Sequence, residues 1–179
     1  MKKLVFLSAL FICLSTLVFA QKTHKIYNSA GSAVMKISVP TDKWNVTNED
    51  GLFSLIPNDS GETSRLITMI WAASDPYSET AMDDIINEAF DVVEALLVDI
   101  VWAEDISDFE NNGISFVAND GYGYYVNEDG SKDKMSTTVM ILMPDDTNLF
   151  TLVFFGTADA YDKWEESLLE VILSIAPAK

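Results

Sequence analysis

Residues 148–156 read NLFTLVFFG, from Asn148 to Gly156, and this stretch decides the fold. Successive side chains of a β-strand point to opposite faces of its sheet. Apolar side chains occupy both alternating sets here: Phe150, Leu152 and Phe154 in one, Leu149, Val153 and Phe155 in the other. A strand that is apolar on both faces must be covered on both faces. The stretch therefore predicts a central strand with further structure packed on each side.

A second stretch, Leu66 to Ala72 (LITMIWA), has the same two-sided apolar pattern. Apolar runs separated by Gly, Pro, Asn and Asp predict the other strands. The expected strands are Ala33 to Val39, Trp44 to Thr47, Leu52 to Ile56, Arg65 to Ala73, Glu104 to Glu110, Ile114 to Val126, Lys134 to Met143 and Asn148 to Gly156. The last four are joined by short connections, which predicts an antiparallel meander.

Two helices are expected between and after these strands. The first runs from about Ala81 to Trp102, with Thr80 as its N-cap, because apolar residues recur at helical spacing opposite acidic ones. The second carries the apolar stripe Tyr161, Trp164, Leu168, Ile172 and Ile175, and ends at Pro177. The prediction is an α+β fold: an antiparallel sheet of about six to eight strands sandwiched by the central and C-terminal helices.

The first 20 residues have the order of a secretory signal peptide. Lys2 and Lys3 precede an apolar run that ends at Ala20. We expect residues 1–20 to be removed and residues 21–179 to form a single domain, exported to the periplasm or the outside of a bacterial cell. An uncleaved membrane anchor and a lipoprotein acylated on Cys13 are the alternatives. Cleavage would leave no membrane span.

The expected exported chain is strongly acidic. Without Lys2 and Lys3, nine basic residues stand against 28 acidic ones, a net charge of −19. Such a field repels nucleic acid and anionic lipid surfaces and attracts cations or basic partners. We therefore expect no nucleic-acid ligand. The other explanation of the charge is a solvated surface that keeps the chain dispersed.

Few catalytic side chains are present. Cys13 is the only cysteine, so the exported chain would have no disulfide and no thiol nucleophile. His24 is the only histidine, and we expect it in a mobile N-terminal segment. A Ser-His-Asp triad, a Cys-His pair and a histidine-rich zinc site are thus excluded. The expectation is a protein that is not an enzyme and has no cofactor.

Carboxylates are the remaining source of chemistry. Glu104, Asp105, Asp108 and Glu110 crowd one segment and are the candidate metal ligands. Clustered carboxylates hold calcium, and paired ones hydrolyse glycosides. A calcium-responsive module and a carboxylate-dependent hydrolase are therefore two alternative functions, and a solvated acidic surface is the third explanation.

The run Asn119 to Gly130 (NDGYGYYVNEDG) combines acids, glycines and tyrosines. It does not match a calcium EF-hand loop, because Tyr125 and Ser136 fall where that loop needs oxygen ligands and a glutamate. A continuous strand with a bulge fits better, with Gly121 and Gly123 admitting a close neighbour such as Trp164. Tyr122, Tyr124 and Tyr125 are then the candidate partner-binding residues.

Two short motifs and the order of elements resemble the PsbP-like family. The motifs are Ile37-Ser38-Val39-Pro40 followed by Trp44, and the ending Tyr161 to Trp164 with Ile172-Leu173-Ser174-Ile175. The family includes the extrinsic photosystem II subunit, a nuclear Ran-binding factor and many exported bacterial proteins and lipoproteins. The resemblance implies an antiparallel sheet sandwiched by helices, acting as an accessory or binding domain. The expected function is thus an exported domain that binds a protein partner of unknown identity.

Overall fold

The structure is a computed structural model that describes residues 20–58, 66–73 and 77–179. The expected signal segment, apart from Ala20, and the expected strand start at Arg65 lie outside the described residues.

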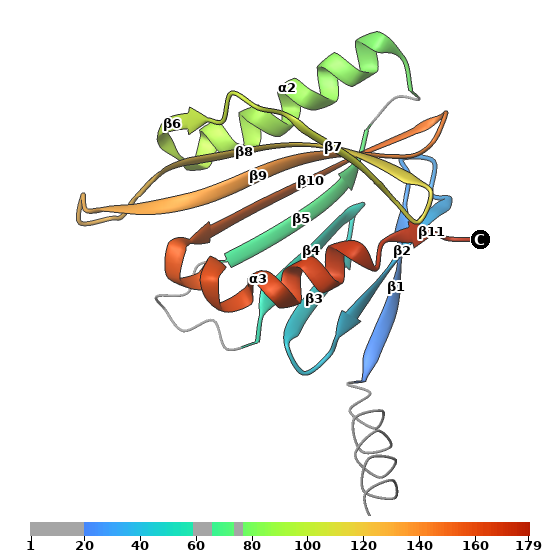
Figure 1. Cartoon of the computed structure of the whole chain (residues 1–179), viewed down its shortest axis with the longest axis horizontal. Coiled ribbons are helices and arrows are strands. Elements are labelled where there is room, and N and C mark those ends of the chain that lie inside the picture. The colour runs from blue at the N-terminus through green and yellow to red at the C-terminus, as the bar shows by residue number, and fades with distance from the viewer. Residues whose placement is uncertain (1–19, 59–65, 74–76) are drawn as a thin grey trace, which may run out of the picture.

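The main element is an eight-stranded antiparallel sheet (Figure 1). Its order is β3 (Trp44–Glu49), β4 (Leu52–Pro57), β5 (Leu66–Ala72), β10 (Asn148–Thr157), β9 (Lys132–Asp145), β8 (Ile114–Val126) and β6 (Val98–Trp102), with β7 (Ser107–Asn111) also paired to β8. A smaller sheet has the order β1 (Gln21–Tyr27), β2 (Ala33–Pro40) and β11 (Ala176–Pro177). The expected α+β class and antiparallel sheet are confirmed.

Helices cover both faces of the central strand β10, as its two-sided apolar pattern predicts. On one face, Phe150, Leu152 and Phe154 share a core with Trp164, Leu168 and Ile172 of α3 (Ala158–Leu173). On the other face, Val153 and Phe155 share a core with Ala89 and Val93 of α2 (Glu79–Leu96). Figure 1 shows the two helices on opposite sides of the sheet. We call these two sides the α3 face and the α2 face.

The central helix is shorter than expected. It ends at Leu96, Leu97 is its extended C-cap, and residues Val98–Trp102 form strand β6 instead of its last turn. β-branched Val98, Ile100 and Val101 favour a strand over a helix. Ile100 still packs against the α2 core, but from β6. The expected helical spacing beyond Leu96 was therefore wrong.

The N-cap of α2 is Ser78, and the expected cap at Thr80 was wrong. The Ser78 side chain accepts a hydrogen bond from the Ala81 backbone N–H at 3.0 Å. Ser78 has extended backbone angles, whereas Thr80 lies inside the helix.

The N-terminal segment is also more ordered than expected. Residues 21–27 form strand β1, in which His24 pairs with Ile37 of β2. The His24 ring meets the Phe53 ring edge-on, with centroids 5.7 Å apart. Burial, reinforced by nearby Lys22, lowers the pKa of His24. The prediction of a mobile tail around His24 was wrong, because β1 pairs along its whole length despite burying only Ile26.

Strand β8 is continuous, as expected, and its pairing with β9 runs without a register shift from Ser115 to Val126. The irregularity lies in its neighbour β6, between Val98 and Val101, where Asp99 has a positive φ of 53°. The close neighbour of Gly121 is Trp102 of β6. Trp164 lies on the α3 face and packs against Trp44, with ring centroids 5.3 Å apart. The expected cover by Trp164 was therefore wrong.

The cap assignment leads to a first prediction. Ser78→Ala should lower the free energy of unfolding by about 0.5–2 kcal/mol, because the Ala81 N–H loses its acceptor. Thr80→Ala is the matched control and should change the free energy little, because alanine is the better helix former. Urea unfolding of the two variants measures the difference. Equal losses from both variants would contradict the cap.

The contact beneath Trp102 leads to a second prediction. A Cβ on Gly121 would lie 2.7 Å from Cε3 of Trp102 and 3.1 Å from the Val101 carbonyl oxygen. Gly121→Ala should therefore cost about 1–3 kcal/mol of stability, as overpacking does. Ser115→Ala, at an exposed position of the same strand, is the control. An unchanged urea midpoint for Gly121→Ala would show that β6 does not hold Trp102 there.

Candidate functional site

The α3 face of the sheet is left uncovered near its β6–β7 edge. Cross-strand partners point to the same face, so Phe109 of β7 lies beside Phe116, Val101 of β6 beside Tyr122, and Val98 beside Tyr124. Helix α3 packs chiefly on β2, β9 and β10. We call Val98, Val101, Phe109, Tyr122 and Tyr124 the apolar strip.

The strip is exposed although it is apolar. Phe109 is 37% exposed, Val98 is 41% and Val101 is 49%, while Tyr122 and Tyr124 are half-buried. Phe109 lies parallel to buried Phe116 with ring centroids 4.6 Å apart, which fixes its orientation. A gathering of exposed apolar side chains on one face is typical of an interaction surface.

Helix α3 contributes two more exposed apolar side chains beside the strip. Leu169 and Leu173 lie one turn apart on the same flank and are 52% and 45% exposed. The side-chain amides of Asn111 and Asn112 donate to the Leu173 carbonyl oxygen at 2.9 and 3.1 Å. These bonds tie the end of α3 to the β7–β8 turn and hold the helix flank next to the strip.

The three predicted partner-binding tyrosines do not lie together. Tyr122 and Tyr124 belong to the strip, whereas Tyr125 lies on the opposite face of β8. The Lys134 ammonium lies 4.0 Å from the Tyr122 ring centroid, and the Lys132 ammonium lies 5.9 Å from that of Tyr124. Lys132 also forms an ion pair with Asp99 of β6 at 2.6 Å. The lysines of β9 thus pack over tyrosine rings or pair with β6.

Carboxylates gather in the middle of this face. Asp120 of β8 accepts a hydrogen bond from the Thr138 hydroxyl at 2.6 Å. The Tyr161 hydroxyl of α3 donates to Glu165 at 3.3 Å. Burial raises the pKa of Tyr161, and the charges of Glu165, Asp120 and Asp162 raise that pKa further. Carboxylates from the sheet and from α3 therefore all raise the pKa of the Tyr161 hydroxyl.

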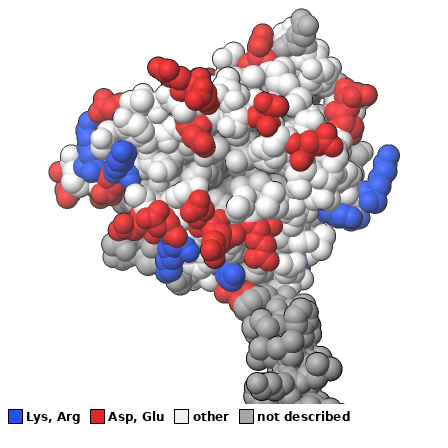
Figure 2. Space-filling model, in the orientation of Figure 1, with Lys and Arg blue, Asp and Glu red and all other residues white. Residues whose placement is uncertain are grey.

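A shallow hollow of about 290 Å³ adjoins this charge. It is lined by Val101, Trp102, Ala103, Asp120, Gly121 and Tyr122. Its walls are almost entirely apolar. In the view of Figure 2, acidic side chains lie above and below an uncharged centre, and basic ones lie toward the periphery.

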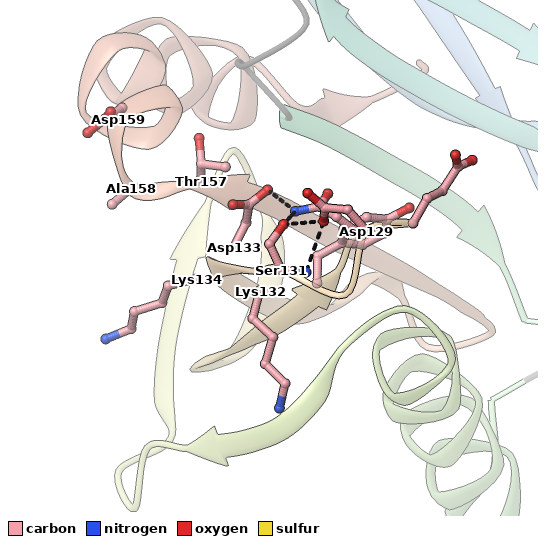
Figure 3. A pocket seen from close by; sticks show the side chains of 11 residues that line it. Asp129, Ser131, Lys132, Asp133, Lys134, Thr157, Ala158 and Asp159 are labelled. Atoms are coloured by element: carbon pink, nitrogen blue, oxygen red, sulfur yellow. Dashed lines mark hydrogen bonds between the residues drawn. The ribbon is translucent and has the colours of Figure 1, made fainter.

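A larger hollow of about 890 Å³ lies between the β8–β9 hairpin and the start of α3 (Figure 3). Tyr125, Asp129, Asp133 and Asp159 are among its lining residues, and Lys132 and Lys134 point away from its carboxylates. Hydrogen bonds from the Ser131 side chain and backbone lower the pKa of Asp129. These bonds close the hairpin turn, so Asp129 serves the local structure.

The four candidate metal ligands are separated by the geometry of β7. Asp108 and Glu110 lie on the side of β7 opposite Phe109, and Glu104 and Asp105 lie in the exposed connection before the strand. Within residues 20–58, 66–73 and 77–179, no three His, Cys, Asp or Glu side chains are placed to hold a metal ion. A calcium site at these residues has no geometric support in that part of the chain.

Calcium binding can be tested directly, and this is a third prediction. A ligand at about 100 times its dissociation constant stabilises a protein by roughly 2.7 kcal/mol, which shifts the thermal midpoint clearly. We expect millimolar calcium to shift the midpoint no more than magnesium at equal ionic strength. A calcium-specific rise that Asp108→Asn with Glu110→Gln abolishes would contradict this expectation.

Sequence reasoning singled out Tyr122 and Tyr124 as partner-binding candidates, and this stays a prediction; it did not single out the other residues of the surface. Val98 and Val101 were assigned to a helix, and their β-branched side chains were the available signal for a strand. Leu169 and Leu173 lie off the apolar stripe of α3, which was the signal that they are exposed. No described helix is long and apolar enough to cross a membrane.

Solved structures of other proteins share this arrangement of helices and strands. No family model matches the sequence, and no curated protein matches it. The solution structure of cyanobacterial PsbP (CyanoP) from Synechocystis sp. PCC 6803 is similar, with a TM-score of 0.55 and 11% identity over 90% of this chain and 95% of that one. The chain has a PsbP-like fold.

A second PsbP-like structure agrees. LpqN, described as involved in cell envelope biogenesis of Mycobacterium tuberculosis, matches with a TM-score of 0.50 and 11% identity. The match covers 89% of this chain and 92% of LpqN. The resemblance drawn from short sequence motifs is thus confirmed at the level of the fold.

Proposed function

We propose that this PsbP-like chain is an exported, non-enzymatic accessory domain that binds another protein through the apolar strip. The observation that carries the proposal is the exposed strip itself, on a sheet face that α3 leaves uncovered. Aromatic and aliphatic side chains held by a rigid sheet are typical anchors of protein interfaces.

The support for a binding role comes from rigidity as well as from exposure. Phe109 stacks on buried Phe116, and Tyr122 and Tyr124 lie on a strand that is paired on both sides. Side chains that are already ordered lose little entropy when a partner binds. The strip is therefore preorganised for association.

The support for a non-enzymatic role comes from the chemistry of the described residues. His24 lies against Phe53 in β1 of the smaller sheet, whereas the strip belongs to the eight-stranded sheet, and burial lowers the pKa of His24. The clustered carboxylates at Tyr161 lie on an open face where water screens them. General acid–base catalysis usually requires a more enclosed site.

The support for export is the charged and apolar order of the first 20 residues. The fold neighbour LpqN, described as involved in cell envelope biogenesis, is consistent with a role outside the cytoplasm. A non-enzymatic accessory domain there would act by holding or presenting its partner.

The test is site-specific photo-crosslinking in the bacterium that encodes the chain, followed by fractionation of its compartments. A photoreactive residue at Val101 should give a protein adduct of discrete mass outside the cytoplasm. The same residue at Leu96 is the control, because Leu96 is 46% exposed but lies on α2. No adduct at Val101, or the same adducts at both positions, would overturn the proposal.

A further inference from the structure

The hollow beside Asp120 combines an apolar wall with a single charge. Val101 and Tyr122, which pair across β6 and β8, line its apolar wall. The Asp120 carboxylate lies outside this wall, on the same face of β8 as Tyr122 and two residues before it. The exposed Asp120 side chain accepts a hydrogen bond from the Thr138 hydroxyl, and both carboxylate oxygens keep further lone pairs. The hollow thus offers van der Waals contact to an apolar stem, and Asp120 beside it offers an acceptor to the polar end of that stem.

The surrounding charge has one sign. Three negative charges raise the pKa of the Tyr161 hydroxyl: those of Asp162 and Glu165 on α3 and that of Asp120 on β8. Among the described residues, no Lys or Arg side chain lies within ion-pair distance of these three carboxylates. The nearby Lys134 packs over the Tyr122 ring instead. The Lys134 ammonium thus lies on this ring and not in an ion pair with the three carboxylates.

Lysine and arginine are the side chains that match such a hollow. Each has an apolar stem that packs along apolar surface and a cationic end that stays near water and charge. The stem would lie over Val101 and Tyr122, and the cation would reach Asp120. A cation there would also be attracted by Glu165 and Asp162 across the face.

We propose that this hollow binds a Lys or Arg side chain from a basic, amphipathic segment of a partner protein. The inference rests on the proposed function, because it specifies the chemistry of the partner that the apolar strip binds. Apolar side chains of the same segment would lie on Val98 and Phe109 to either side and on Leu169 of α3. The net charge of the chain, −17 over its full sequence, would bring such a segment to the surface rapidly.

The first test uses three synthetic peptides and the chain from Ala20 onward, which contains every described element. In the first peptide leucine alternates with lysine, in the second with acetyllysine, and in the third with glutamate. Only the lysine peptide should bind by titration calorimetry and shift the backbone amide signal of Gly121, which lines the hollow. If the acetyllysine peptide bound as tightly as the lysine peptide, the positive charge of the ligand would have no role and the proposal would be overturned.

A matched pair of variants separates the hollow from the general acidity of the chain. Asp120→Asn removes one charge and keeps an acceptor for Thr138, and it should weaken the lysine peptide about threefold to tenfold. Asp84→Asn removes one charge from the exposed face of α2 and should leave the affinity unchanged. Equal weakening by both would show that only the overall field attracts the peptide, and would overturn the proposal.

A second pair tests the apolar wall. Val101→Ser should weaken the lysine peptide by several-fold, whereas Leu96→Ser on α2 should not. Both side chains are about half exposed, so neither change should alter folding, and urea unfolding checks this. Loss of peptide binding only in Leu96→Ser would place the interaction on α2 instead.

The two proposals fail in different ways. If a discrete adduct forms at Val101 in cells but the lysine peptide does not bind, the strip binds a partner of different chemistry. If the lysine peptide binds at Gly121 but no adduct forms in cells, the hollow is cation-selective but the chain has no protein partner there under those conditions.

Discussion

The apolar character of β10 on both faces is the constraint on which the rest of the structure depends. Burial of apolar surface is the main favourable term in folding, so neither face of this strand can stay in water. Helix α3 covers Phe150, Leu152 and Phe154, and α2 covers Val153 and Phe155. β5 and β9 pair with the two edges of β10, and the other strands extend the sheet from them.

The same constraint explains why one region stays uncovered. A helix placed to cover β10 is too narrow to cover the whole of a sheet with this many strands. α3 packs on β2, β9 and β10, and its end is tied to the β7–β8 turn by Asn111 and Asn112. The outer part of β8 and its partner β6 therefore keep Tyr122, Tyr124, Val98 and Val101 at the surface.

The negative charge of the chain opposes non-specific association through this exposed apolar surface. The acidic residues of α2 and α3 repel other copies of the chain and reduce non-specific association. The same charges favour a partner of opposite sign over other proteins. Apolar contact would then supply affinity, while the carboxylates near Tyr161 would supply selectivity.

The sequence by itself determined the α+β class, the antiparallel meander and the two covering helices, because alternation and helical spacing report which faces are buried. It also identified Tyr122 and Tyr124 as surface candidates. Tertiary structure alone decided that residues 98–102 pair with β8, that His24 lies in a strand, and that Asp120 lies near Tyr161. Each of these depends on contacts between residues distant in the chain. Local spacing carries no record of such contacts.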